Sequence, residues 1–167
     1  MWTSWSLLAV WVATACATDL YRRRIPNGIV VAGLLGGLCL QGLTPSGGGL
    51  FAAQQFGGLG LASALLAGAM MLPATFVLWR LRFFGAGDAK LLTAASVWFA
   101  PTDVLPLMLV TLVAGGVQAI ATLWLAYEGR VAMRMDAASP ARLPYSLAIA
   151  CACFAVASGV TRGFWPY

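Results

Sequence analysis

The apolar residues of this chain are gathered into six runs, and this grouping limits the folds open to it. A helix needs about 20 apolar residues to cross the hydrocarbon core of a bilayer, within a range of roughly 17–25. All but one of the runs approach or reach that length, the fourth being shorter: 2–20, 26–43, 57–79, 88–100, 104–127 and 144–160. Hydrophobic residues make up 61% of the chain and charged residues 9%, whereas soluble domains are roughly half apolar and about a quarter charged. The sequence therefore predicts an all-α integral membrane protein. We expect residues 1–167 to form a single domain, a six-segment transmembrane helix bundle with a short fourth helix.

The basic residues lie unevenly in the connections between these runs. Cytoplasmic loops of membrane proteins carry an excess of Lys and Arg. This rule predicts a cytoplasmic position for all the basic residues except Arg162, namely Arg22, Arg23, Arg24, Arg80, Arg82, Lys90, Arg130, Arg134 and Arg142. Both termini are then external. The net charge of +5 is explained by topology and by contacts with lipid headgroups, so nucleic acid is not expected as a partner.

Two aspartates mark the ends of apolar runs. Asp19 lies at the end of the first run, and Asp88 opens the fourth within Gly85-Ala86-Gly87-Asp88. Ionisable residues within membrane segments are rare, and they default to functional hypotheses. The predicted topology places both carboxylates at the cytoplasmic membrane face. If the first and fourth spans are neighbours, the two carboxylates can meet.

Each aspartate also has a structural explanation. Asp88 can cap a helix, because a carboxylate accepts N–H bonds and suits the positive end of the helix dipole. Asp19 can form an interfacial ion pair with Arg22 or Arg23. Both alternatives remain open at the level of sequence.

The glycines beside Asp88 have two interpretations of their own. Gly85 and Gly87 can let the backbone of a bound chain approach closely, or they can adopt positive φ. Lys90 follows two residues after Asp88 and can tune the carboxylate or reach the headgroups.

Two nearby carboxylates can carry out peptide hydrolysis. One takes a proton from water, while the other, protonated, donates to the carbonyl oxygen and later to the leaving amine. Like charges resist joint ionisation, so the pair shares one proton. No cofactor or metal is expected, because the chain has no histidine and its four cysteines form no C-x-x-C pair.

The motifs together resemble those of the prepilin peptidases, intramembrane aspartic proteases of the G-x-G-D type. Gly85-Ala86-Gly87-Asp88-Ala89-Lys90 is similar to the family's G-x-G-D-x-K signature. Asp19 through Asn27, with basic residues before Ile-Pro-Asn, resembles the family's first catalytic element. Leu143-Pro144-Tyr145-Ser146 is similar to the start of the family's last span.

The resemblance implies that Asp19 and Asp88 are the catalytic pair. It implies a prepilin or prepilin-like substrate, whose short leader is cut after Gly at the cytoplasmic face of a bacterial inner membrane. Other residues are expected to bind substrate or shape the site: Gly85, Gly87, Lys90, Arg24, Pro26, Asn27, Pro144 and Tyr145. The chain lacks the C-x-x-C insert of the larger enzymes that also methylate, so we expect a peptidase-only form like those of tight-adherence (Flp-type) pilus systems. Archaeal preflagellin peptidases are a related alternative.

Two further classes of function fit the composition. A small ion-coupled transporter can use membrane carboxylates as a proton relay, although here both acids lie near one face and no clear inverted repeat is present. A non-enzymatic assembly subunit can use Gly-rich helices only for packing against partners.

Overall fold

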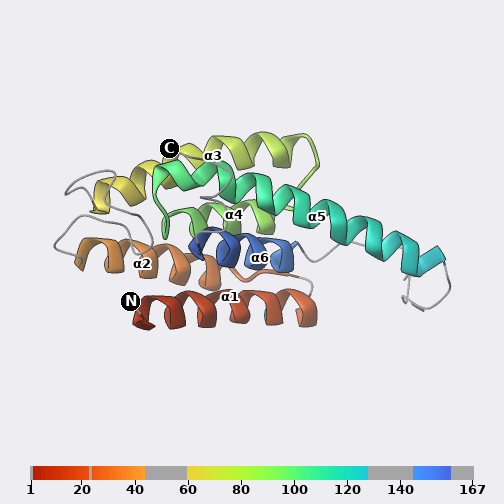
Figure 1. Ribbon diagram of the computed structural model, residues 1–167, viewed down its shortest axis with the longest axis horizontal. Helices are drawn as coiled ribbons and strands as arrows, with labels where there is room; N and C mark the ends of the chain where they lie inside the picture. Colours follow the sequence, from red (N-terminus) through yellow and green to blue (C-terminus); the bar gives the residue numbers. More distant parts are fainter. Residues whose placement is uncertain (1, 23, 44–59, 128–144, 159–167) are drawn as a thin grey trace.

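The computed structural model describes residues 2–22, 24–43, 60–127 and 145–158. These residues form six α-helices and one short 3-10 helix, and no strand occurs among them. The elements in chain order are α1 (Trp2–Arg22), α2 (Asn27–Leu43), α3 (Gly60–Arg80), α4 (Ala86–Ser96), η1 (Pro101–Asp103), α5 (Val104–Tyr127) and α6 (Ser146–Ala157). The predictions of an all-α fold and of a short fourth helix are confirmed over the described part of the chain (Figure 1).

The bounds of α4 differ from the predicted segment 88–100. The helix begins at Ala86, so Asp88 lies inside its first turn, and it ends at Ser96. Beyond Ser96, the N–H groups of Trp98 and Phe99 bond to the carbonyls of Ala95 and Ser96, three residues back. This tightened turn leads into Pro101, the first residue of η1. Hydropathy did not reveal this end, because the apolar run continues through the turn.

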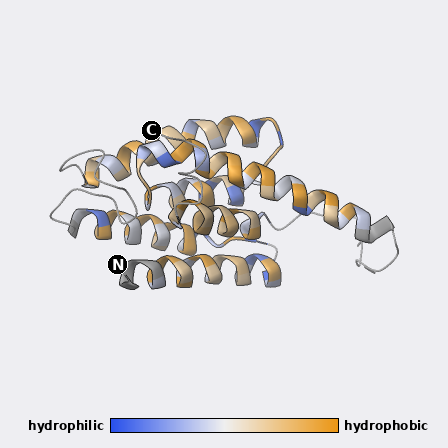
Figure 2. Ribbon diagram, viewed as in Figure 1, coloured by the Kyte–Doolittle hydropathy of each residue, from blue (hydrophilic) through white to orange (hydrophobic). Residues whose placement is uncertain are grey.

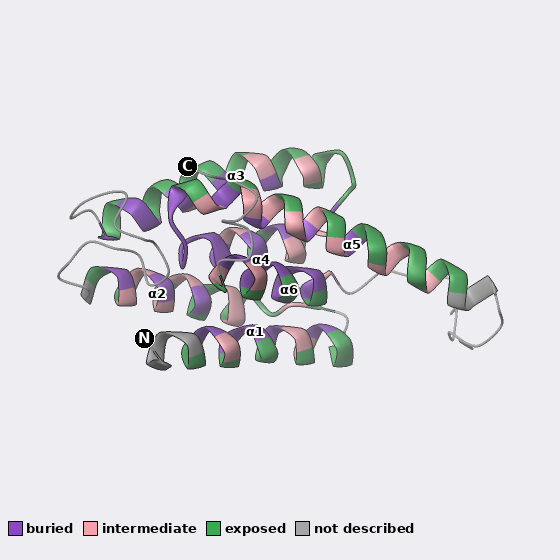
Figure 3. Ribbon diagram, viewed as in Figure 1, coloured by how far each residue is buried: buried purple, intermediate pink, exposed green. Residues whose placement is uncertain are grey.

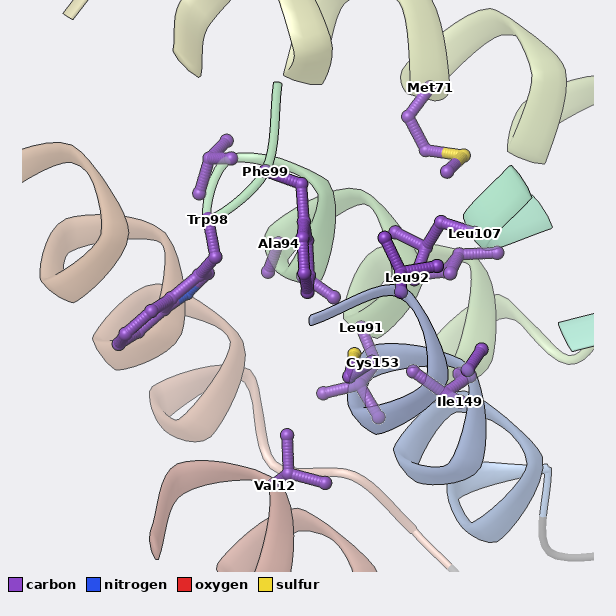
Figure 4. Close-up of a cluster of buried hydrophobic side chains, with 14 of the residues drawn as sticks. Val12, Met71, Leu91, Leu92, Ala94, Trp98, Phe99, Leu107, Ile149 and Cys153 are labelled. Carbon is purple, nitrogen blue, oxygen red and sulfur yellow. The ribbon is translucent and has the colours of Figure 1, made fainter. Parts of the chain in front are cut away.

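Helix α4 lies at the centre of the bundle. Helices α2, α3, α5 and α6 all pack against it. Figure 4 shows the buried side chains around α4, with Val12 from α1, Met71 from α3 and Ile149 from α6 among them. Most of the residues of α4 beyond its first turn are buried by these neighbours. Its 11 residues extend about 16 Å, roughly half the hydrocarbon thickness of a bilayer.

Tryptophans fasten α1 and α2 to the end of α4. The indole rings of Trp11 and Trp98 stack with centroids 5.9 Å apart. Trp11 Nε1 donates to the carbonyl of Ile29 at 2.8 Å, and Trp98 Nε1 donates to the carbonyl of Gly33 at 2.9 Å. These bonds satisfy the indole N–H groups, which a largely buried tryptophan requires.

Two helices are long and apolar enough to cross a membrane, namely α3 and the segment Pro101–Trp124 that includes most of α5. Only 28% and 22% of their apolar windows are buried within the protein, whereas a core helix of a soluble protein would be mostly buried. Hydrophobic residues and exposed positions coincide along both helices (Figures 2 and 3). The exposed apolar side chains include Leu65, Met70, Phe76, Val77, Val113, Val117, Ile120 and Leu123.

The arrangement brings three helix ends together at one end of the bundle. Figure 1 shows that the C-terminal end of α1 and the N-terminal ends of α4 and α6 lie at the same end. Helix α6 packs against both α1 and α4. Of the two termini, Met1 and residues 159–167 lie outside the described residues, as do Arg23, Arg130, Arg134, Arg142 and Arg162.

Candidate active site

Asp19 lies in the last turn of α1 and is largely buried. Its side chain is 8% exposed, and its Oδ2 atom has no hydrogen-bond partner within the described residues. Arg22, one of the two residues predicted to pair with it, is exposed and forms no ion pair with Asp19. Arg23, the other, lies outside the described residues. A buried carboxylate oxygen without a partner is costly, so this position needs an explanation other than surface charge.

Asp88 is the third residue of α4 and is half-buried. Its Oδ2 atom accepts a hydrogen bond from the backbone N–H of Gly85, the residue before the helix, at 3.2 Å. The helix-cap interpretation is therefore confirmed for this oxygen. A carboxylate in the first turn also faces the positive end of the helix dipole, which stabilises the ionised form. The cap fixes the side chain against the start of α4, so it orients Asp88 rather than excluding a chemical role.

The two glycines before Asp88 have ordinary dihedral angles, and their role is to avoid a side chain at these positions. Gly85 has φ −70° and ψ 153°, an extended conformation open to any residue. Gly87 likewise shows no positive φ. The positive-φ interpretation of both glycines is therefore wrong. A Cβ on Gly85 would lie 2.8 Å from Asp88 Oδ2, so a larger residue there would require the carboxylate to leave its present position at this cap.

The two motifs identified in the sequence contact each other. Ile25 lies over Gly87, so that a Cβ on Gly87 would sit 3.5 Å from Ile25 Cβ. Lys90 Nζ donates a hydrogen bond to Asn27 Oδ1 at 3.3 Å. The segment that follows α1 is thus docked on the first turn of α4. Helix α1 itself packs mainly on α6 and α2 rather than directly on α4, so the expected pairing of the first and fourth spans runs through this segment and through α6.

Pro26 sets the path of that segment. A proline disfavours the helical conformation of the preceding residue, which stops α1 from continuing into α2. Helix α2 begins one residue later, and the carbonyl of Pro26 accepts the N–H of Ile29 at 3.0 Å. Arg24 is exposed at the same end of the bundle.

The start of α6 closes this end of the bundle. The ring of Tyr145 meets Phe84 edge to face, with centroids 5.3 Å apart, and also lies against Gly115 of α5. The thiol of Cys16, one turn before Asp19, contacts the main-chain oxygen of Ser146 at 3.3 Å. Tyr145 was predicted from the sequence and Pro144 lies outside the described residues. Ser146 and Ile25 fall within the quoted motifs but were not predicted as site residues.

Over the described ranges, no group of three or more His, Cys, Asp or Glu side chains could hold a metal ion.

A comparison with known families bears on this arrangement. The sequence profile of the type IV leader peptidase family matches residues 6–120, more than half of the chain. The chain belongs to this family. The resemblance to prepilin peptidases is thereby confirmed, and membership implies a protease that acts on prepilin-like substrates. No curated protein and no solved structure matches the chain significantly.

The family match covers both aspartates of this leader peptidase and the motifs around them. It extends from α1 into α5 and ends before Tyr145 and α6. Helix α6 packs against α1 and α4, so this part of the site is formed by residues outside the matched region.

Proposed function

We propose that this family member is a membrane-embedded aspartic endopeptidase with Asp19 and Asp88 as its catalytic pair. Its substrate is a type IV prepilin of the Flp-like kind, whose leader is cut after Gly at the cytoplasmic membrane face. The observation that carries the proposal is the docking of Ile25 and Asn27 onto the first turn of α4. This contact joins the two chain segments that bear buried or half-buried carboxylates at one end of the bundle.

The proposed reaction needs only the two carboxylates and a water molecule. One carboxylate accepts a proton from water as the oxygen attacks the peptide carbonyl. The other carboxyl donates its proton to the carbonyl oxygen, and the tetrahedral intermediate collapses as the leaving amine takes up a proton from the pair. The burial of Asp19 strengthens electrostatic interactions at the site, because it lowers the local dielectric constant.

The membrane setting of this proposal rests on the exposed apolar faces. Helices α3 and α5 present large apolar side chains outward, which is the pattern expected of lipid-facing helices. We propose that all six helices lie in a bacterial inner membrane, that residues 1–167 form a single domain, and that both termini are external. In this arrangement Arg22, Arg24, Arg80, Arg82 and Lys90 mark the cytoplasmic face, where anionic headgroups attract basic side chains.

The test is a cleavage assay with matched acid variants. The full chain is co-expressed with a Flp-type prepilin, and the precursor is followed by gel shift. Cleavage by the wild type and its loss in Asp19→Asn and Asp88→Asn support the proposal. Asp103→Asn is the matched control, because it removes a carboxylate from η1, at the far end of α4. It is expected to retain cleavage.

Intact cleavage in both Asp19→Asn and Asp88→Asn would refute the two-aspartate mechanism. A buried Asp19 whose Oδ2 atom has no partner among the described residues would also suit a proton relay. Proton flux into liposomes that contain the protein, abolished by Asp19→Asn in the absence of any cleavage, would favour the ion-coupled transporter instead.

A further inference from the structure

Two buried side-chain oxygens near the end of α1 lack hydrogen-bond partners within the described residues. One is Oδ2 of Asp19 and the other is the hydroxyl of Ser146, whose side chain is 1% exposed. An unsatisfied buried polar group lowers stability, and native proteins keep few of them. Two such groups on helices that pack together call for a common explanation.

The contact between Cys16 and Ser146 places the two oxygens near each other along the bundle. Cys16 Sγ lies 3.3 Å from the main-chain oxygen of Ser146. Residues three apart on a helix share a face, so Asp19 lies one turn beyond Cys16 on the face turned toward α6. Helices α1 and α6 run in opposite directions (Figure 1). Because Cys16 already contacts Ser146, the step to Asp19 leads one turn past the start of α6, and a side chain at the first position of a helix tilts toward that end.

Apart from its contact with the thiol of Cys16, which is a weak hydrogen-bonding group, the hydroxyl of Ser146 has no structural role among the described residues. It is the first residue of α6, yet no side chain caps that end of the helix. The residues that follow it are mostly small or apolar, and α6 continues as Leu147-Ala148-Ile149-Ala150. An alanine at position 146 would fill nearly the same space without burying an unpartnered hydroxyl.

We propose that Ser146 is a positioning residue for Asp19, and that its hydroxyl donates a hydrogen bond to the unpartnered carboxylate oxygen when substrate is bound. This inference rests on the proposed function, in which Asp19 is one of the reacting carboxylates. Hydrogen bonds at catalytic groups are often long without substrate and shorten in the complex. A donor to the carboxylate stabilises its ionised form and fixes its orientation.

The test compares pH profiles of kcat/KM for the purified full chain with a Flp-type prepilin. Ser146→Ala removes a donor to the ionised carboxylate, so the acidic limb of the profile is expected to move to higher pH by about one unit. At pH values below that limb, kcat/KM of the variant is expected to be about tenfold lower than that of the wild type. Ser146→Thr keeps the hydroxyl and is expected to return the limb toward its wild-type position.

Ser96→Ala is the structural control. Its hydroxyl is fully buried and bonds to the carbonyls of Thr93 and Ala67, at 2.7 and 3.5 Å. Its loss is expected to lower the thermal unfolding temperature and leave the pH profile in place. Ser146→Ala is expected to shift the pH profile and to leave the thermal unfolding temperature unlowered.

An unchanged pH profile in folded Ser146→Ala would overturn the inference, and so would an equal loss of rate at every pH. Neither result touches the proposed function as long as wild type cleaves and Asp19→Asn does not. Absence of cleavage by the wild type, or full activity in Asp19→Asn, would instead be a failure of the proposed function itself.

Discussion

Lys90 Nζ donates a hydrogen bond to Asn27 Oδ1 over 3.3 Å, although 63 positions separate the two residues in the chain. The bond ties the first residue of α2 to α4 two positions after Asp88. Together with the contact between Ile25 and Gly87, it fixes the segment after Asp19 on the helix that carries Asp88. The relative position of the two carboxylates therefore depends on the hydrogen bond between Lys90 and Asn27, which we call the clasp.

The clasp can be tested by a double-mutant cycle. Lys90→Met and Asn27→Ala are each expected to lower kcat/KM by about three- to tenfold, since an exposed hydrogen bond contributes on the order of 1 kcal/mol. The double variant is expected to be no worse than the poorer single variant, because one bond is lost in every case. The measurement is kcat/KM of the wild type and the three variants, from cleavage rates over the same series of substrate concentrations.

Arg80→Met controls for the loss of a cation at the same end of the bundle. Arg80 is exposed in the last turn of α3, and its replacement is expected to leave kcat/KM close to wild type. If the effects of Lys90→Met and Asn27→Ala multiply in the double variant, the two residues act independently and the clasp has no role in cleavage.

The two glycines of the Gly-x-Gly-Asp motif should respond differently to the addition of one methyl group. A Cβ on Gly85 would lie 2.8 Å from Asp88 Oδ2, closer than real Cβ atoms approach an oxygen. Gly85→Ala should therefore displace the carboxylate and reduce kcat by about 100-fold or more, because catalytic groups need placement within about half an ångström.

Gly87→Ala serves as the partner variant. Its Cβ would lie 3.5 Å from Ile25 Cβ, an ordinary van der Waals contact, so the resting fold should be kept. Gly87→Val adds γ-carbons against Ile25, so it is expected to displace the segment after α1 from α4 and to lose cleavage while the rest of the bundle stays folded. Thermal unfolding in detergent separates folding from activity. A fully active Gly85→Ala would contradict the spatial role of this glycine.

The end of the bundle near Tyr145 offers a second pair of neighbouring glycines. Gly116 in α5 has open space around it, whereas a Cβ on Gly115 would clash with Cε1 of Tyr145 and lie 2.8 Å from its Cδ1. Gly116→Ala should raise stability by up to about 1 kcal/mol, because alanine is the better helix former. Gly115→Ala should displace Tyr145 and lower both the unfolding temperature and cleavage.

The comparison of Gly115→Ala with Gly116→Ala is informative because the substitutions are chemically identical and adjacent. Calorimetry in detergent and the cleavage assay are the two measurements. Equal behaviour of the two variants would show that the ring of Tyr145 moves freely and does not hold α6 in place.

How far the sequence predicts this molecule can be seen at particular residues. The bounds of α5 match the predicted segment 104–127, because Pro101 and the polar residues after Tyr127 interrupt the apolar run on both sides. The end of α4 at Ser96 was not predicted, because Trp98 and Phe99 are apolar whether they belong to a helix or to a buried turn.

The parts of the site differ in the same way. Asp19 and Asp88 stand out because charge is rare in apolar runs. The placement of Ile25 over Gly87 and the unpartnered hydroxyl of Ser146 depend on how α2 and α6 pack, which no local pattern encodes. Periodicity predicts helices and charge predicts candidate residues, but contacts between distant segments emerge only from the packed bundle.

The turn between α3 and α4 contains a strained residue. Arg82 has φ 64°, a left-handed conformation that side chains other than glycine rarely adopt. Its N–H bonds to the carbonyl of Trp79 at 3.0 Å, and the N–H of Phe83 bonds to that of Leu78 at 3.0 Å. This is the bonding pattern of a Schellman motif, in which glycine is the usual residue at the left-handed position.

Arg82→Gly is therefore expected to stabilise the protein by about 1 kcal/mol, because it relieves the left-handed strain while the two turn bonds remain. Arg80→Gly is the matched control, since it removes the same charge from the last turn of α3, where glycine lowers helix stability by a similar amount. Unfolding temperatures in detergent should rise for the first variant and fall for the second. A fall for both would show that the charge of Arg82, rather than its backbone conformation, governs the stability of this turn.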